Sequence, residues 1–273
     1  MRCFFSSIRF SFIFTGLMLL FITAPVFGAG QNELRSSEDV DFPLFNAPKT
    51  DAEILRRDSE GSSRGRSRSM MTRRTGELTR GLIRGKDMEK KEVPVPSHII
   101  PLVPETVGLT SKTQPALFWY VSDSWPEKME FRLNAFKAEE PLVDTHITGP
   151  SSEGIYRIDL ADYDVTLKPG VEYDWFLTIV FDENDRSADY FISGTIIYSP
   201  LSDDVSRHLA NTSEDRLYAV YAGSGYWYDA MDHLSRQIDL RPEDASLRRY
   251  RAKLLEQVNL PKIAAYDIQQ ISK

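Results

Sequence analysis

The chain contains a single cysteine, Cys3, among its 273 residues. Disulfide bonds, thiolate catalysis and cysteine-ligated zinc or iron–sulfur sites are therefore excluded from the rest of the chain. Cys3 precedes the first apolar run, whereas the lipid-bearing cysteine of a lipoprotein follows such a run. Stability must therefore come from a hydrophobic core.

Histidines are also scarce, and the phosphate-binding GxGxxG and Walker motifs are missing. The four histidines are His98, His146, His208 and His233. No two have the helix spacing of a zinc site. Ser224, in AGSGYW, lacks one glycine of a GxSxG nucleophile turn. We expect no catalytic residue, no cofactor and no metal; a hydrolase using carboxylates such as Asp162 and Asp164 is the third hypothesis.

The longest apolar run lies near the start of the chain. Arg2 and Arg9 precede it, it covers residues 10–22, and small residues follow around Gly28. This order predicts a secretory signal peptide over residues 1–28. An uncleaved membrane anchor is the alternative, because the run is slightly shorter than the roughly 20 residues of a spanning helix. Export without disulfides favours the periplasm or cell surface of a bacterium.

Residues 29–97 contain few apolar side chains and predict a disordered basic linker. Lys and Arg are in excess over residues 56–91, although the whole chain carries a formal net charge of −7. A basic tract can neutralise nucleic-acid phosphates, but export argues against nucleic acid as a partner. Contact with anionic lipid, polysaccharide or the acidic remainder of the chain fits better.

From residue 98 the composition changes to short runs rich in β-branched and aromatic residues, separated by Pro, Gly, Asp and Ser. Residues 128–136 alternate, with Phe131 and Leu133 on one side and Glu130 and Arg132 on the other. One face of this strand is therefore expected to be buried and the other to face solvent. We predict an immunoglobulin/fibronectin III-like antiparallel β-sandwich over residues 98–200. The predicted strands are HIIPLV, ALFWYV, KMEFRLNAF, GIYRIDL, VEYDWFLTIVF and DYFISGTIIY.

The segment LKPGVEYDWFL has the spacing of a tyrosine corner, in which a Tyr hydroxyl bonds to upstream backbone at a sheet corner. We assign it a structural role. Trp175 lies on the same side of the strand as Tyr173 and is expected in the core. The five residues that carry this assignment are Leu167, Pro169, Gly170, Tyr173 and Trp175.

An acidic cluster, Asp182, Asn184, Asp185 and Asp189, separates the last two predicted strands. Asn and Asp favour tight turns, so we predict a hairpin turn. The alternative is calcium, which takes six to eight oxygens. The spacing does not match a helix-loop-helix calcium site, and Arg186 already supplies a counter-charge.

The segments GLTSKTQPALFWYVS, LKPGVEYDW and DENDRSADYFISGTI together resemble the exported bacterial family known as domain of unknown function 928, which is common in cyanobacteria. The resemblance covers Gly108 to Val258. It implies an envelope protein and supplies no catalytic residue. Two positions depart from the family pattern: Phe181 stands where Cys is common, and Glu183 where Pro is frequent.

Residues 201–273 predict a three-helix tail. Thr212 is the expected N-cap of the first helix. The first two helices resemble a tetratricopeptide repeat, and the third, starting at Pro242, would act as a cap. Either the helices pack on the sandwich, or they dock a tetratricopeptide partner. The repeat-like positions are Leu217, Tyr221, Gly225, Ala230 and Pro242.

Four aromatics near predicted turns, Trp125, Tyr226, Trp227 and Tyr228, are the candidate interaction residues. An exposed aromatic row could stack on sugar rings, whereas burial under the helices is the alternative. The function hypothesis is a non-catalytic module that binds another envelope protein. The alternative is a carbohydrate-binding module at the cell surface, with calcium at the acidic turn. Membrane contact is expected only through the signal segment or the basic linker.

Overall fold

The computed structural model describes Phe42 and residues 44–48, 96–184 and 186–272. The predicted signal peptide and almost all of the predicted linker lie outside these residues. The strands are β1 Ile99–Pro101, β2 Gly108–Thr110, β3 Ala116–Val121, β4 Lys128–Ala135, β5 Val143–Thr148, β6 Gly154–Asp159, β7 Glu172–Ile179 and β8 Tyr190–Tyr198. The helices are α2 Asp203–Ala210, α3 Leu217–Gly223, α4 Trp227–Leu240, α5 Ala245–Gln257 and α6 Pro261–Gln269.

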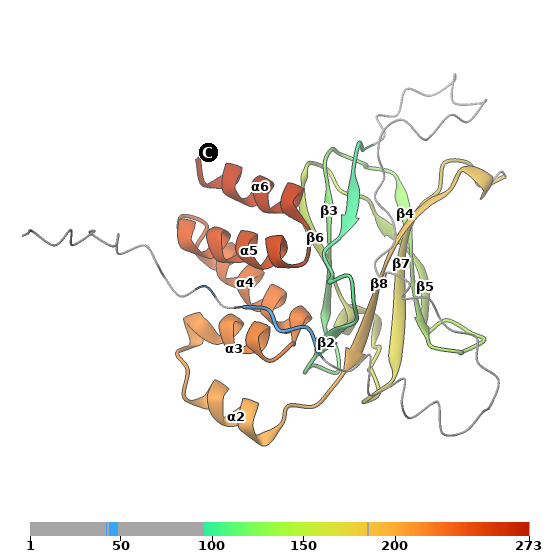
Figure 1. Cartoon of the computed structure of the whole chain (residues 1–273). Helices are drawn as coiled ribbons and strands as arrows, with labels where there is room; N and C mark the ends of the chain where they lie inside the picture. Colours follow the sequence, from blue (N-terminus) through green and yellow to red (C-terminus); the bar gives the residue numbers. More distant parts are fainter. Residues whose placement is uncertain (1–41, 43, 49–95, 185, 273) are drawn as a thin grey trace, which may run out of the picture. The chain divides into compact units, whose positions relative to one another are not determined.

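The strands form two sheets. One has three strands in the order β1-β3-β6, and the other has five in the order β2-β8-β7-β4-β5 (Figure 1). All six predicted strands are present. The prediction of purely antiparallel pairing is wrong at one pair, because β2 runs parallel to β8.

Two strands, β2 and β5, were missed. Strand β2 has only three residues, too short for an alternating pattern. Strand β5, VDTHIT, carries Asp144 and His146 and is an edge strand with mostly accessible side chains. Edge strands are often polar, because charge discourages pairing with other chains.

One hydrophobic core contains side chains from both sheets. Strand β7 alternates between half-buried and buried residues, which places Trp175 and Leu177 inside the molecule. Phe131 and Leu133 of β4 lie beside them and are fully buried. The period of two expected for a sheet with one covered face is therefore present on the five-stranded sheet.

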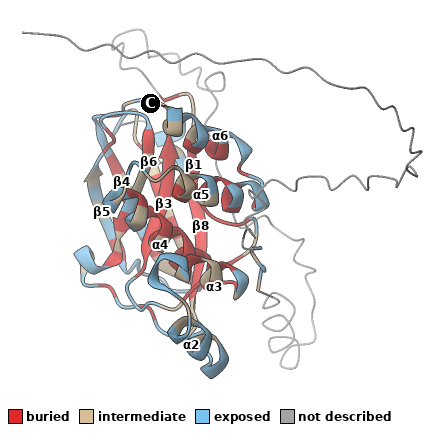
Figure 2. Cartoon of the chain, turned by 90° about the vertical axis from the view of Figure 1, so that its left-hand side faces the viewer, coloured by how far each residue is buried: buried red, intermediate tan, exposed pale blue. Residues whose placement is uncertain are grey.

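The helices cover the three-stranded sheet, whose central strand β3 is buried along its whole length (Figure 2). Tyr120 of β3 packs against Tyr266 of α6 with ring centroids 5.2 Å apart. Trp227, at the start of α4, donates a hydrogen bond from its indole nitrogen to the Leu102 carbonyl, at 2.8 Å. Among the described residues, no helix has the length and apolar character needed to cross a membrane.

The C-terminal region contains five helices rather than the predicted three. Helix α2 was missed because its apolar stripe is only two residues long, Val205 and Leu209, neither of them fully buried, although Ser202 caps its first turn. Helix α6 was missed although Pro261 occupies its first turn, a common helix-start position. Thr212 is not an N-cap: its hydroxyl donates to the His208 carbonyl at the end of α2.

Candidate functional site

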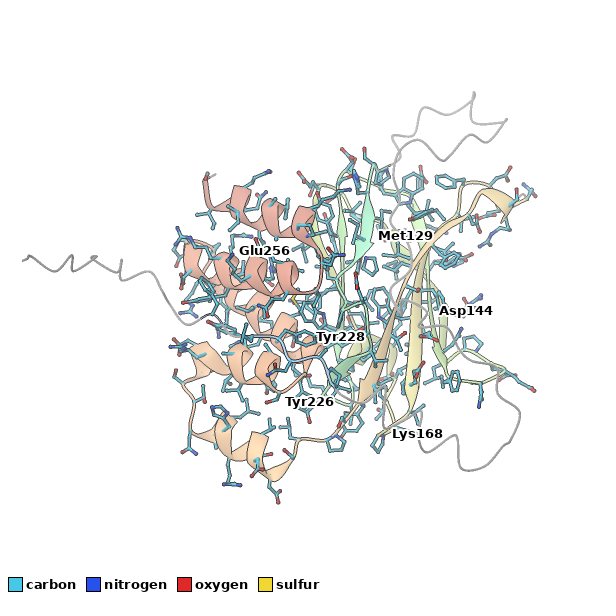
Figure 3. The ribbon with its side chains drawn as sticks, viewed as in Figure 1. Met129, Asp144, Lys168, Tyr226, Tyr228 and Glu256 are labelled. Atoms are coloured by element: carbon cyan, nitrogen blue, oxygen red, sulfur yellow. The ribbon has the colours of Figure 1, made fainter. Side chains whose placement is uncertain are left out.

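The outer face of the five-stranded sheet is accessible and carries a mixed aromatic and charged surface, which we call the open face. Strand alternation places these side chains outward, opposite the core. Asp144, on β5, lies on the side of this sheet away from the helices (Figure 3). The open face contains a depression of about 340 Å³. Its lining residues are Glu130, Arg132, Asn134, Phe176, Thr178, Arg186 and Phe191.

Two phenylalanines form the apolar part of the open face. Phe176 on β7 and Phe191 on β8 contact each other edge to face, with ring centroids 6.1 Å apart. Phe191 is 50% exposed. An aromatic pair at the surface offers apolar area to a ligand at little conformational cost.

Arg186 forms the charged part of the open face. Its guanidinium donates two hydrogen bonds to the Glu130 carboxylate, at 2.9 and 2.7 Å, and a third to Asp189. The hydrogen bonds to Glu130 and Asp189 raise the pKa of Arg186. The bidentate pair holds the turn between β7 and β8 against β4, beside the phenylalanines. A second pair, Arg132 with Asp144 at 2.8 Å, continues the charged surface towards the sheet edge.

The acidic cluster forms a turn. The Asp182 carboxylate accepts a hydrogen bond from the backbone N–H of Asn184 at 2.8 Å, an arrangement in which the side chain closes the turn. Asp189 pairs with Arg186, and Asp185 lies outside the described residues. Within the described part of the chain, no three His, Cys, Asp or Glu side chains are placed to hold a metal ion.

The tyrosine-corner residues lie where the sequence places them. The Tyr173 hydroxyl accepts a hydrogen bond from the backbone N–H of Lys168 at 2.9 Å. Gly170 has φ of +73°, a backbone conformation that residues with a side chain rarely adopt. Leu167 and Trp175 are buried in the core. Pro169, just before the glycine, forms a bridge to β8.

The four candidate interaction aromatics, Trp125, Tyr226, Trp227 and Tyr228, are at most 6% exposed. A partner therefore cannot reach them in this structure, which agrees with the burial alternative. Tyr226, Trp227 and Tyr228 are buried because the start of α4 inserts towards both sheets, whereas Trp125 packs edge to face on Phe181, with ring centroids 5.8 Å apart. Gly108 makes room for this insertion, because a Cβ there would lie 2.6 Å from the Tyr228 ring.

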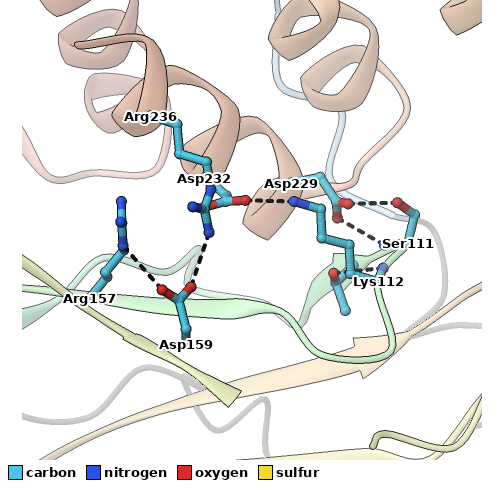
Figure 4. A network of polar contacts seen from close by, with 8 residues as sticks. Ser111, Lys112, Arg157, Asp159, Asp229, Asp232 and Arg236 are labelled. Atoms are coloured by element: carbon cyan, nitrogen blue, oxygen red, sulfur yellow. Dashed lines mark hydrogen bonds and ion pairs between the residues drawn. The ribbon is translucent and has the colours of Figure 1, made fainter. Parts of the chain in front are cut away.

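A polar network joins α4 to the sheets (Figure 4). The buried Asp229 carboxylate accepts hydrogen bonds from the Ser111 backbone N–H at 2.8 Å and from its hydroxyl at 2.6 Å. One turn later, Asp232 pairs with Lys112 at 2.5 Å and with Arg236 at 2.8 Å. The network continues through Arg236, Asp159, Arg157 and Asp239. Its members pair with one another and attach α4 to the sheets.

We expect Asp229→Asn to change how stability depends on pH. Burial raises the pKa of Asp229, although hydrogen bonds from Ser111 and the nearby Lys112 charge oppose the shift. Above the ordinary Asp pKa of 3.8, the unfolded chain has released this proton before the folded chain. The stabilising contribution is therefore present below that pH and is lost as the pH rises through the folded pKa.

Urea titration at several pH values measures the free energy of unfolding of both chains. The value for wild type should fall relative to that for Asp229→Asn as the pH rises from 4. The asparagine can still accept from the Ser111 N–H and donate to its hydroxyl. Asp239→Asn changes an exposed ion pair and is the control. Its free energy of unfolding should depend on pH as that of wild type does. A parallel profile for Asp229→Asn would contradict the burial argument.

The solvent-facing side of β4 was predicted from the sequence, but the open face was not predicted as a site. The alternation of Glu130 and Arg132 with apolar residues was visible. Phe176 and Phe191, however, look like core residues, because nothing local distinguishes an outward phenylalanine from an inward one. Only the register of β7 with β8 brings the two together.

The family model described as Domain of Unknown Function (DUF928) matches residues 75–268. This range contains both sheets and nearly all of the helical region. A comparison with curated proteins finds no match. The resemblance carried by the segments around Gly108, Tyr173 and Asp189 is thereby confirmed, and the chain belongs to the DUF928 family.

Proposed function

We propose that this protein is a non-catalytic binding module and that its open face binds another protein. One observation carries the proposal: the helices cover the outer face of the three-stranded sheet, whereas the five-stranded sheet keeps an accessible face with an exposed phenylalanine pair. An exposed apolar group surrounded by paired charges is typical of an interaction surface.

The chemistry of the open face favours a protein partner. Phe191 and Phe176 supply an apolar centre, and Glu130, Arg132 and Arg186 surround it with charge. Interface centres are enriched in aromatics and arginine, with polar groups at the rim. A polysaccharide, stacked on the phenylalanines, is the alternative ligand. A hydrolase is the third possibility, with no described cluster of reactive groups to support it.

We expect a photo-crosslinking amino acid at position 191 to capture a discrete protein from the native envelope of the source cell. The same group at position 240, where Leu240 is 77% exposed on α4, is the matched control and should capture nothing specific. Arg186→Ala should reduce the yield at position 191, since it removes the charged border of the site. Mass spectrometry identifies the captured protein.

Equal capture at positions 191 and 240 would contradict the proposal. Retention of the wild-type chain on an immobilised envelope polysaccharide, lost on Phe191→Ala, would instead support the carbohydrate alternative. Turnover of a glycan, ester or peptide by the purified chain would reject the non-catalytic assignment.

We further propose that the two sheets form an immunoglobulin-like sandwich. Three features support this: the strand order β1-β3-β6 against β2-β8-β7-β4-β5, the parallel pairing of β2 with β8, and the hydrogen bond of Tyr173 to upstream backbone. The tetratricopeptide-like character of α3 and α4 is also a proposal. It rests on the order of Leu217, Tyr221 and Gly225 and on a helix pair at the expected positions.

Export to a bacterial envelope is part of the proposed function. It rests on the basic residues and apolar run at the start of the sequence and on the lack of cysteine after Cys3. Cell fractionation of the source organism, with an antibody against the chain, tests it directly. Recovery only with soluble cytosolic proteins would contradict it.

A further inference from the structure

A second surface, separate from the open face, lies on the helical region and is occupied by a segment of the chain itself, of which Phe42 and residues 44–48 are described. We call it the helical groove. Its floor is formed by Trp227, at the start of α4, and by Tyr250 and Gln257 on α5; its rim is the end of α3. The segment, coloured blue in Figure 1, runs along these helices.

Aromatic contacts hold the segment at two points. Phe45 packs edge to face on Trp227, with ring centroids 5.0 Å apart. Phe42 packs edge to face on Tyr250 at 5.6 Å, and the Lys253 ammonium lies 6.0 Å from the Phe42 ring. The two phenylalanines, three positions apart, thus contact two different helices, α5 and α4.

Groups on α3 and α5 form hydrogen bonds with the backbone and with one side chain of the segment. The Gln257 amide oxygen accepts from the Phe45 N–H at 2.6 Å. At the end of α3, the Ala222 carbonyl accepts from the Asn46 N–H at 3.2 Å, and the Gly223 carbonyl accepts from the Asn46 side chain at 2.8 Å. The last carbonyls of a helix lack partners within it, so they are available to a segment that brings donors.

Gly225 completes the groove. Its φ is +85°, and a Cβ at this position would lie 2.9 Å from the Asn46 carbonyl oxygen. The glycine therefore allows both the turn between α3 and α4 and the close approach of the segment. The surface is shaped for an extended backbone.

The segment is itself accessible. Leu44, Asn46 and Ala47 are exposed, and Phe45 is only half-buried, whereas Trp227 beneath it has no exposed surface. Removal of the segment would therefore uncover apolar surface that another segment can cover. A ligand with more contacts can replace the segment by simple competition.

From these contacts we infer that the helical groove is a peptide-binding site for a partner protein. The ligand is an extended segment with two aromatic side chains three positions apart, followed directly by asparagine. Phe42 and residues 44–48 occupy the groove as an internal ligand, and the partner's segment displaces them. The contacts of Phe42, Phe45 and Asn46 define the chemistry of the ligand.

The test uses the full chain and the synthetic peptide FPLFNAP, which copies residues 42–48. Phe45→Ala removes the main anchor of the internal ligand and leaves the groove intact. The peptide should bind this variant at least about tenfold more tightly than wild type, the factor expected when the internal ligand fills nine grooves in ten. The Trp227 indole N–H resonance, followed by NMR up to millimolar peptide, reports on the groove itself.

Three controls separate the outcomes. Leu44→Ala, at a 71% exposed position, should bind the peptide as wild type does. A peptide with alanine at both phenylalanines should not shift the Trp227 resonance of the Phe45→Ala chain. Gln257→Ala, combined with Phe45→Ala, should weaken binding of the peptide. An unchanged amide spectrum away from the groove verifies that each variant is folded.

Two results would overturn the inference. One is a Phe45→Ala chain whose Trp227 resonance does not respond to millimolar peptide; the other is equal affinity in wild type and Phe45→Ala. Self-association of wild type that Phe45→Ala abolishes, seen by sedimentation, would assign the groove to a second copy of this chain and reject a different protein as its occupant.

Discussion

Replacing Asp267 by alanine is expected to lower the free energy of unfolding by about 3–5 kcal/mol, the largest effect of any substitution considered, because it leaves a buried arginine without its partner. Arg251 on α5 is 5% exposed, and Asp267 on α6 has no exposed surface. The two side chains form a bidentate pair with both N···O distances at 2.7 Å. Ser235 on α4 accepts a further hydrogen bond from Arg251 at 3.0 Å, so the cluster joins three helices.

Urea denaturation followed by circular dichroism measures the effect. Asp239→Ala is the matched control: its carboxylate pairs with Arg157 at 3.1 Å but its side chain is 67% exposed, so a loss within about 1 kcal/mol is expected. Changing both members of the buried pair, Arg251→Met with Asp267→Ala, should recover part of the loss because no buried charge remains. Equal losses for Asp267→Ala and Asp239→Ala would contradict the account.

Tyr228→Phe is expected to have the second largest effect, lowering the free energy of unfolding by about 1–3 kcal/mol through the loss of one buried hydroxyl. The hydroxyl accepts from the Trp175 indole at 3.1 Å and donates to the Thr195 carbonyl at 3.1 Å. Trp175 has no exposed surface, so water cannot replace the lost partner. Burial raises the pKa of Tyr228, which keeps the hydroxyl protonated and able to donate.

Tyr156→Phe is the control for this substitution. The Tyr156 hydroxyl donates to the Ser152 carbonyl at 2.9 Å in an exposed position, where water takes over the bond. Thermal denaturation should therefore give a smaller loss for Tyr156→Phe than for Tyr228→Phe. Similar losses would show that the Tyr228 hydroxyl does not attach the helices to the sheets. Both variants keep the ring, so the comparison isolates the hydrogen bonds from ring packing.

The two stability predictions concern the same feature, the attachment of the helical region. Tyr228 reaches the five-stranded sheet from the first turn of α4, whereas Arg251 and Asp267 hold the later helices together. If the helices were loosely attached, the helical groove and the open face would move independently. Tyr228, Asp229 and Asp232 attach the helices tightly, so the helical groove and the open face keep fixed positions relative to each other.

Strands and their inner faces could be predicted from the sequence because each depends on a local pattern. Alternation over Phe131 and Leu133, and the Leu-x-Pro-Gly-x-x-Tyr spacing ending at Tyr173, are properties of short segments. Helices α2 and α6 were not predicted because their local sequence patterns are weak. The first buries nothing, and the second is short, so neither shows a long apolar stripe.

Exposure, by contrast, could not be predicted for individual aromatics. For Trp227 and Tyr228, which follow a glycine turn, the sequence left both exposure and burial open; they are buried because helix and sheets converge there. Phe191 lies in a strand rich in apolar residues, yet it is 50% exposed. Which neighbours cover a side chain depends on segments far away in the sequence, and local composition contains no information about them.

The sequence by itself determined the family, six of the strands, the buried face of β4, and the lack of any cysteine-based chemistry after Cys3, because these depend on residue types and short spacings. The tertiary structure alone decided which sheet face is covered by helices, which aromatics remain accessible, and that Phe42 and residues 44–48 lie on α3, α4 and α5. These features arise from contacts between distant segments, whose free energy depends on the folded arrangement and not on the local sequence.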